Sequence, residues 1–254
     1  MKKRVLNSII LIVTVFSIIM LYRKNAGMDE NRQINIFADK AAEWSKDYLS
    51  DPYPFYITVA DLNKDGRLEL ITARIEGTGK YSQNRYYVVD EESQEVIKLQ
   101  EYPAERLKSP DLIYDVIYQE KESVDVPVYY DKKNNKFYSI HRDFGRVTSH
   151  ELTEAVVSVS MNRDVIEEQY MAYKNFEYDS EGDILAISYR DYSGNGLSEE
   201  EYKAIEGCTY SGMQKKKMTW KWQKVTGSQI ANMEQYEVYK VLKDIYSSLK
   251  IVDE

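Results

Sequence analysis

The feature that most constrains this chain is its first segment, in which a basic start precedes a long apolar run. Residues 1–4 are Met-Lys-Lys-Arg, and residues 5–22 carry no charged side chain. Eighteen residues of helix rise about 27 Å, close to the ~30 Å hydrocarbon core of a bilayer. The pattern predicts an uncleaved signal-anchor, with residues 1–27 as a cytoplasmic start and transmembrane helix. Residues 28–254 would then form the extracytoplasmic part of a single-pass cell-membrane protein.

Cleavage of this segment is the alternative, and it would release a secreted protein. Arg23 and Lys24 follow the apolar run and weaken the charge asymmetry that sets orientation. A signal peptidase would cut near the small-residue pair Ala26-Gly27, which lacks the usual A-x-A pattern. Both interpretations place the chain beyond residue 28 outside the cytoplasm.

The charge balance argues against a nucleic-acid partner. The chain has 34 Lys and Arg against 42 Asp and Glu, a net charge of -8. Five of the basic residues lie within the first 25 residues, so the remainder has 29 basic against 42 acidic groups, a net of -13. A body this acidic is repelled by a phosphate backbone. We therefore expect the partners to be the membrane, through the N-terminal helix, and a cell-surface polymer or protein.

Beyond residue 28 we expect an α+β fold, mainly antiparallel sheet with flanking helices, in one domain. Residues 29–49 have apolar side chains at three- and four-residue steps, which predicts a helix that packs on the sheet through Ile34, Phe37, Ala41 and Trp44. Apolar segments separated by turn residues predict strands at 55–60, 68–75, 85–89, 95–99, 126–130, 136–140, 176–178 and 184–189. The polar run 179–183 predicts a hairpin turn.

Two further helices are expected near the C-terminal end. Ser198 and Glu201 have the spacing of a capping box, in which the hydroxyl and the carboxylate each satisfy a free amide of the first turn. Gly207 is a plausible end for this helix. Ser228 is placed to cap a last helix that runs to Leu249.

One segment has the composition of a binding site. Asp61, Asn63 and Asp65 place oxygen-bearing side chains at alternate positions, and Gly66 supplies a tight turn. Hard oxygen ligands at this spacing suit Ca²⁺. The pattern covers the first half of an EF-hand loop, but Thr72 stands where that loop has its bidentate Glu, and strand patterns flank the segment.

The loop resembles the calcium loops of FG-GAP and VCBS-type repeats, with their D-x-(D/N)-x-D-G-x-x-(D/E)-hydrophobic signature. This resemblance covers about ten residues and implies side-chain ligation by Asp61, Asn63, Asp65 and Glu69, with the Arg67 carbonyl as a further ligand. The chain as a whole also resembles singly anchored exported proteins of Gram-positive bacteria, a group from which no activity carries over. The other interpretation of the same residues is a plain hairpin turn with solvated acids.

These features favour a non-enzymatic binding or assembly domain at the cell surface with one structural Ca²⁺ loop. The alternative is an exported hydrolase of cell-wall or host glycans, with its acids among Asp111, Asp115 and Asp143; a sensor coupled to other membrane proteins is a third option. The sequence has no nucleophile elbow and no metalloprotease motif. His141 and His150 are the two histidines and lack the spacing of a zinc site. We therefore expect no catalytic residue.

Overall fold

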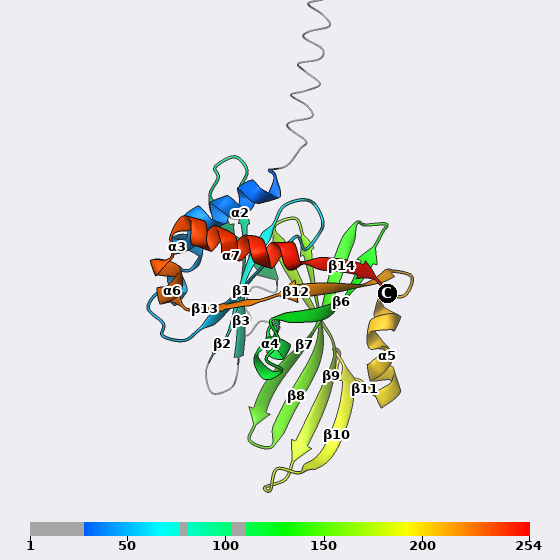
Figure 1. Ribbon diagram of the computed structural model, residues 1–254. Coiled ribbons are helices and arrows are strands. Elements are labelled where there is room, and N and C mark those ends of the chain that lie inside the picture. The colour runs from blue at the N-terminus through cyan, green and yellow to red at the C-terminus, as the bar shows by residue number, and fades with distance from the viewer. Residues whose placement is uncertain (1–27, 77–80, 103–109) are drawn as a thin grey trace, which may run out of the picture.

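A five-stranded antiparallel sheet forms the N-terminal part of the protein. The computed structural model describes residues 28–76, 81–102 and 110–254 (Figure 1). The strand order of this small sheet is β13-β1-β2-β3-β4. Its strands are β1 (Phe55–Ala60), β2 (Glu69–Glu76), β3 (Tyr81–Val89), β4 (Val96–Lys98) and β13 (Gln223–Val225).

A larger sheet follows, and its longest strands extend away from the end of the molecule that holds most of the helices (Figure 1). Its strand order is β11-β10-β9-β8-β7-β6-β12-β14, all antiparallel, and β5 pairs with β9 in parallel. Its strands are β5 (Gln100–Tyr102), β6 (Ser123–Asp131), β7 (Lys136–Thr148), β8 (Glu151–Asn162), β9 (Val165–Tyr178), β10 (Ile184–Asp191), β11 (Gly196–Leu197), β12 (Gln214–Lys221) and β14 (Lys250–Asp253).

The helices are few and short. Four of them, α2, α3, α6 and α7, lie together at one end of the molecule, while α5 lies beside the large sheet (Figure 1). The helical segments are α2 (Glu30–Asp39), α3 (Ala41–Trp44), the 3-10 turn η1 (Lys46–Tyr48), α4 (Tyr114–Tyr118), α5 (Glu199–Thr209), α6 (Gly227–Asn232) and α7 (Gln235–Ser248).

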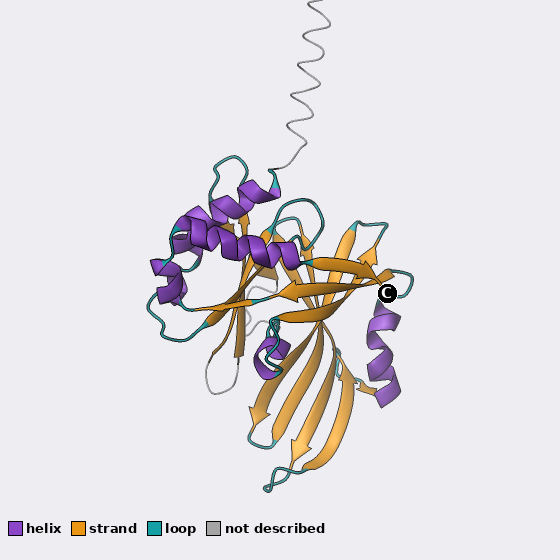
Figure 2. Cartoon of the chain, in the orientation of Figure 1, coloured by secondary structure: helices purple, strands orange, loops and turns teal. Residues whose placement is uncertain are grey.

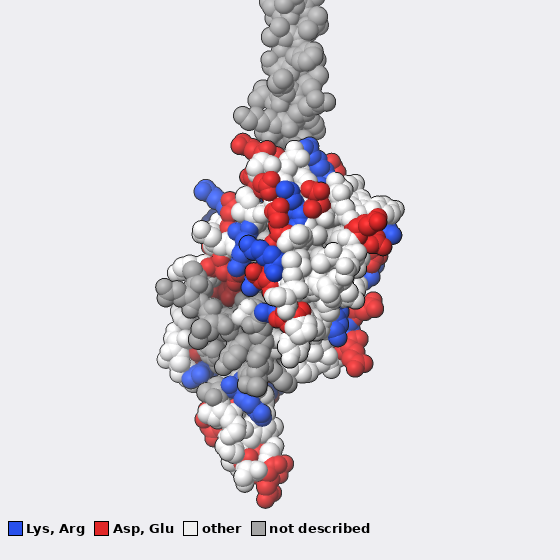
Figure 3. Space-filling view, turned by 90° about the vertical axis from the view of Figure 1, so that its left-hand side faces the viewer, with Lys and Arg blue, Asp and Glu red and all other residues white. Residues whose placement is uncertain are grey.

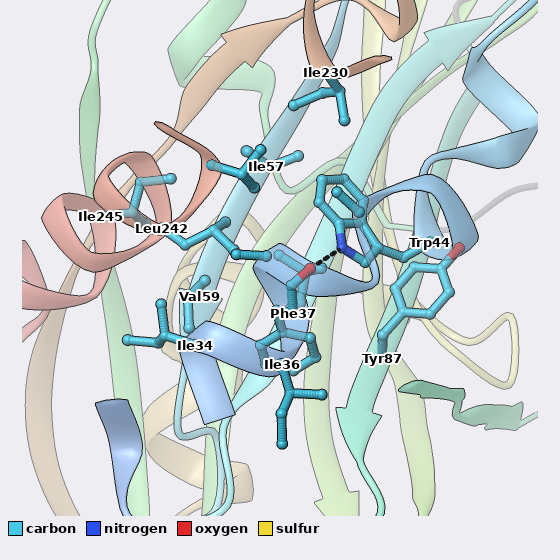
Figure 4. Close-up of a cluster of buried hydrophobic side chains, with 14 of the residues drawn as sticks. Ile34, Ile36, Phe37, Trp44, Ile57, Val59, Tyr87, Ile230, Leu242 and Ile245 are labelled. Atoms are coloured by element: carbon cyan, nitrogen blue, oxygen red, sulfur yellow. Dashed lines mark hydrogen bonds between the residues drawn. The ribbon is translucent and has the colours of Figure 1, made fainter. Parts of the chain in front are cut away.

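The small sheet is buried on both faces, because helices cover one face and the large sheet covers the other. Side chains alternate along a strand, so Leu70 joins the cluster under the helices and Ile71 joins the cluster between the sheets. The first cluster includes Ile34, Phe37 and Trp44, as expected, and the Trp44 indole N–H donates to the Phe37 carbonyl at 2.7 Å (Figure 4).

The predicted α+β class is wrong. The described chain is mostly antiparallel β-sheet, as the predominance of strands in Figure 2 shows. The helix expected over 29–49 divides into α2, α3 and η1, because Lys40 leaves helical geometry with φ -94° and ψ 22°. The strand pattern that starts at Lys136, in contrast, continues through three strands of 12 to 14 residues.

Local signals near the C-terminus are partly confirmed. Ser198 and Glu201 form the predicted capping box at the start of α5. Gly207 lies inside that helix and does not end it. The last predicted helix is two helices, since Met233 adopts an extended conformation between α6 and α7, and Thr226 caps the first of them in place of Ser228.

The predicted transmembrane helix, residues 5–22, lies outside the described residues. Within the ranges that the structure describes, no helix combines the length and the apolar character needed to span a bilayer. On the face shown in Figure 3, Lys and Arg side chains lie among Asp and Glu side chains in the upper part of the described chain. Elsewhere in the described chain, Lys40 pairs with both Glu43 and Glu95 at 3.2 Å.

Candidate functional site

The Asp61–Glu69 segment is the loop that joins β1 to β2. Ala60 and Glu69 are paired across these strands, so the two ends of the loop lie side by side. Lys64 and Gly66 both have positive φ, at 59° and 89°, which reverses the chain tightly. A left-handed backbone is unstrained for glycine, which explains the choice of residue at 66.

The polar side chains of the loop turn inward and accept hydrogen bonds from its backbone. The two carboxylate oxygens of Asp61 accept from the amides of Asp65 and Gly66, both at 3.1 Å. Asp65 accepts from the amide of Arg67 at 2.8 Å and from the Asn63 side-chain amide at 2.9 Å. These bonds hold the predicted ligands around one small loop. A cation bound there would replace the bond between the Asn63 and Asp65 side chains.

Glu69 differs from the other acids of the loop because it is completely buried, with 0% exposure. Its Oε2 accepts from the Leu62 amide at 2.8 Å, but its Oε1 has no hydrogen-bond partner in the described part of the chain. Burial raises the pKa of the Glu69 carboxyl well above its ordinary value, and the nearby charges of Asp61 and Asp65 raise it further. A buried negative charge lowers the stability of the fold. The Glu69 carboxyl would therefore either take up a proton or bind a cation.

The loop also connects three parts of the fold. The buried Gln33 of α2 donates to the Gly66 carbonyl at 2.8 Å and accepts from the Leu68 amide at 2.7 Å. On the other side, the Arg67 guanidinium pairs with Asp164 at 2.7 Å and donates to the Arg163 carbonyl at 3.1 Å. Asp164 lies in the turn between β8 and β9, so the loop links α2, the small sheet and the large sheet.

A second group of acids, which the sequence analysis treated as a turn, lies between β9 and β10. Asp179, Glu181 and Asp183 have oxygens that all lie within 4.8 Å of one another, so this group could hold a metal ion. No such triad of carboxylates is formed by Asp61, Asp65 and Glu69 among the described residues. The alternate spacing of acids at 179, 181 and 183 is the same signal that singled out the first loop.

Ser139, His141 and Asp143 lie at alternate positions on β7 and invite comparison with a catalytic triad. The Ser139 hydroxyl donates to the Val159 carbonyl at 3.2 Å, and its oxygen lies 2.9 Å from His141 Nε2. A serine hydroxyl that gives its hydrogen to a carbonyl does not offer that hydrogen to the histidine. Burial lowers the pKa of His141 to about 3, which makes it a poor base.

The acids of the hydrolase alternative are divided between two places. Asp111 and Asp115 line a cleft of about 340 Å³ between α4, α5, β6 and β7. Asp143 is buried outside this lining and accepts from the Tyr170 hydroxyl at 2.8 Å. The sequence analysis did not predict the cleft, because its walls come from four separate segments.

No protein-family model matches the chain, and comparison with curated proteins and with solved structures gave no match either, so its function has to be inferred from its own residues.

Proposed function

We propose that residues 28–254 form a non-enzymatic binding or assembly domain on the outer side of the cell membrane, and that one Ca²⁺ in the Asp61–Glu69 loop stabilises it. The ion would be coordinated by Asp61, Asn63, Asp65 and Glu69, with the Arg67 carbonyl and solvent completing the sphere. Its role is structural, because the loop has no neighbouring base or nucleophile among the described residues for a metal to activate.

The observation that carries this proposal is the burial of the Glu69 carboxyl with one of its oxygens unpartnered among the described residues. Its Oε1 is buried and has no hydrogen-bond partner among the described residues, and the two nearest acids add negative charge. Ca²⁺ takes six to eight oxygen ligands and would use this atom. The ion would also compensate the combined charge of Asp61, Asp65 and Glu69, which Arg67 balances only in part because it pairs with Asp164.

The test is the melting temperature of the full-length chain, in a mild nonionic detergent, with chelator and with Ca²⁺. The ligand set lacks a bidentate acid at the twelfth position, so we expect a dissociation constant of about 10⁻⁴–10⁻³ M. Calcium at about 100 times a dissociation constant of ~10⁻⁴ M would add about 2.7 kcal/mol to the free energy of unfolding. Glu69→Gln should remove this gain. In the presence of chelator, the variant should melt at a temperature at least as high as that of wild type.

Asp183→Asn is the matched control, because it removes a charge from the second acidic group. It should keep the full calcium-dependent gain. If Asp183→Asn loses the gain and Glu69→Gln keeps it, the ion binds at the β9–β10 turn. If calcium leaves the wild-type melting temperature unchanged, the Asp61–Glu69 loop is only a turn.

A further inference from the structure

The outer edge of the large sheet carries an unpaired length of strand. β10 pairs with β9 on one side, but on its other side the short strand β11 pairs only with Tyr189 and Arg190. Residues 184–188 therefore have no partner strand on that side among the described residues. All of them are exposed, and in Figure 1 their hairpin forms the end of the molecule opposite to α2. An open edge of this kind presents backbone N–H and C=O groups to another strand.

The large side chains of this edge are apolar although they face solvent. Ile184, Leu185 and Ile187 are exposed by 53%, 68% and 43%. Leu185 is the extra residue of a β-bulge, because the pairing with β9 shifts between Ile184 and Ala186. Sheets usually protect an open edge with charged residues or proline, and residues 184–188 include neither.

An apolar row leads across the sheet to this edge. Phe176 of β9 is paired with Leu152 of β8 on one side and with Ile187 of β10 on the other, so the three side chains share one face of the sheet. Leu152 and Phe176 are half-buried and Ile187 is exposed, which places the uncovered end of the row at the free edge. A strand added beside β10 would extend this row and cover Ile187.

The charge beside this edge favours a basic partner. Asp179, Glu181 and Asp183 lie in the turn that leads into β10, and their oxygens lie within 4.8 Å of one another. Glu151 and Glu177 face each other on the adjoining strands and add two like charges. None of these acids has an ion-pair partner in the ranges that the structure describes. Figure 3 accordingly shows Asp and Glu side chains at the lower tip of the described chain.

A second copy of the chain fits this edge poorly. Two β10 strands related by a two-fold axis would run antiparallel and bring the acidic turn of one copy toward β11 and the first turn of α5 in the other. That helical turn is acidic as well, since it contains Glu199, Glu200 and Glu201, of which Glu199 is paired with Lys203. Like charges would oppose this pairing, whereas a basic segment would be attracted.

The opposite edge of the large sheet offers a contrast. Its outer strand is β14, and the acids at the end of that strand, Asp253 and Glu254, already pair with Lys216 and Lys215 of β12. Both edges carry exposed apolar side chains, but the unpaired acids lie at the β10 edge. The two edges can therefore be compared directly in an experiment.

We propose that the free edge of β10 binds an extended segment of a partner protein, which adds a strand to the large sheet. The segment would have apolar side chains at alternate positions, in line with Ile187, and basic residues at the end that meets the acidic turn. If it runs antiparallel to β10, as the neighbouring strand β9 does, its C-terminal end meets that turn. This inference rests on the binding or assembly function proposed above and names the class of partner, but it requires no calcium.

A synthetic peptide provides the test. The probe is fluorescein-labelled Thr-Val-Thr-Val-Thr-Val-Lys-Lys-Lys, and its fluorescence anisotropy is measured with the full-length chain in mild nonionic detergent and chelator. We expect saturable binding. The same peptide with glutamates in place of the lysines should not bind over the same concentration range. A peptide with Pro-Pro in place of its central Thr-Val should not bind either, because proline cannot donate to a strand ladder.

Variants connect the binding to this edge. Ile187→Lys places a cation on the free edge and should weaken binding about tenfold. Val252→Lys is the matched control, because Val252 is an exposed apolar residue of β14, at 48%, and this variant should bind as wild type does. The double variant Glu181→Gln, Asp183→Asn should bind about fivefold more weakly. It leaves in place Asp179, whose carboxylate accepts from the backbone amides of the turn.

Amide hydrogen exchange locates the peptide, which should slow exchange within residues 184–188 and leave residues 250–253 unchanged. The proposal is overturned if no saturable binding occurs, if the glutamate or the proline peptide binds equally well, or if Ile187→Lys binds unchanged. Sedimentation of the full-length chain tests the other occupant: a wild-type dimer that Ile187→Lys dissociates would assign the edge to a second copy and would also overturn the proposal. Because chelator is present throughout, these outcomes do not depend on the calcium loop.

Discussion

A methyl group added at Gly227 tests the contact between the first turn of α6 and the segment after α3. Gly227 is the first residue of α6 and is buried. A Cβ atom built there would lie 2.0 Å from the Tyr48 carbonyl oxygen and 2.7 Å from the Leu49 Cα. Both neighbours are backbone atoms, so no side-chain rotation relieves the overlap. Gly227→Ala must therefore push α6 away from η1.

The size of the effect follows from two opposing contributions. Forcing extra volume into a packed interior costs typically about 1–3 kcal/mol, and a 2.0 Å backbone contact favours the upper end. Replacing glycine by alanine in a helix returns at most about 1 kcal/mol. We expect Gly227→Ala to lower the free energy of unfolding by about 2 kcal/mol.

Urea unfolding of the full-length chain, followed by tryptophan fluorescence, measures this change, because Trp44, Trp220 and Trp222 are all buried. Gly207→Ala is the matched control. Gly207 also lies in a helix, and a Cβ there meets nothing within 4 Å, so that variant should be as stable as wild type or up to about 1 kcal/mol more stable. The reasoning is refuted if the two variants shift the urea midpoint alike.

Three further outcomes are expected from the same urea assay. Phe37→Ala removes a completely buried ring and should cost about 3–5 kcal/mol; a loss below 1 kcal/mol would contradict its place in the core. Ser198→Ala removes the cap of α5 and should cost about 1 kcal/mol, whereas Ser228→Ala, which caps no helix, should cost less. Burial lowers the pKa of His141 to about 3, below the ~6.5 of an unfolded chain, so the unfolded state binds more protons as pH falls. Between pH 7 and about 5.5, wild type should therefore lose about 1 kcal/mol more than His141→Gln does; equal losses would show that His141 titrates normally.

The sequence predicted those features that depend on near neighbours. The capping box needs only Ser198 and Glu201, three residues apart, and it formed as expected. The β1–β2 turn likewise follows from Gly66 and the polar residues before it. The prediction of one helix over 29–49 was wrong because the backbone leaves helical geometry at Lys40, and the apolar periodicity of the segment does not mark such a break.

The proportion of sheet to helix also could not be predicted from local sequence patterns. Pairing along β8 and β9 joins residues up to 26 positions apart, as Glu151 and Glu177 show, and this pairing sets the length of the large sheet. Tyrosine and threonine patterns indicate strands, but the partner strand decides how far each strand extends. The α+β class was therefore wrong: the segments predicted as strands do lie in strands, but β8, β12, β14 and most of β9 were not predicted.

By itself the sequence determined which residues between 61 and 69 carry oxygen-bearing side chains, because their spacing is fixed by the chain. Only the tertiary structure decided that Glu69 is buried with one oxygen unpartnered among the described residues, since that burial comes from the packing of α2 and both sheets. The same holds for the cleft, where Asp115 and His141 come from α4 and β7. The spacing of residues along the chain is a local property. Whether a polar atom is removed from solvent, and so gains from binding a ligand, depends on the whole fold.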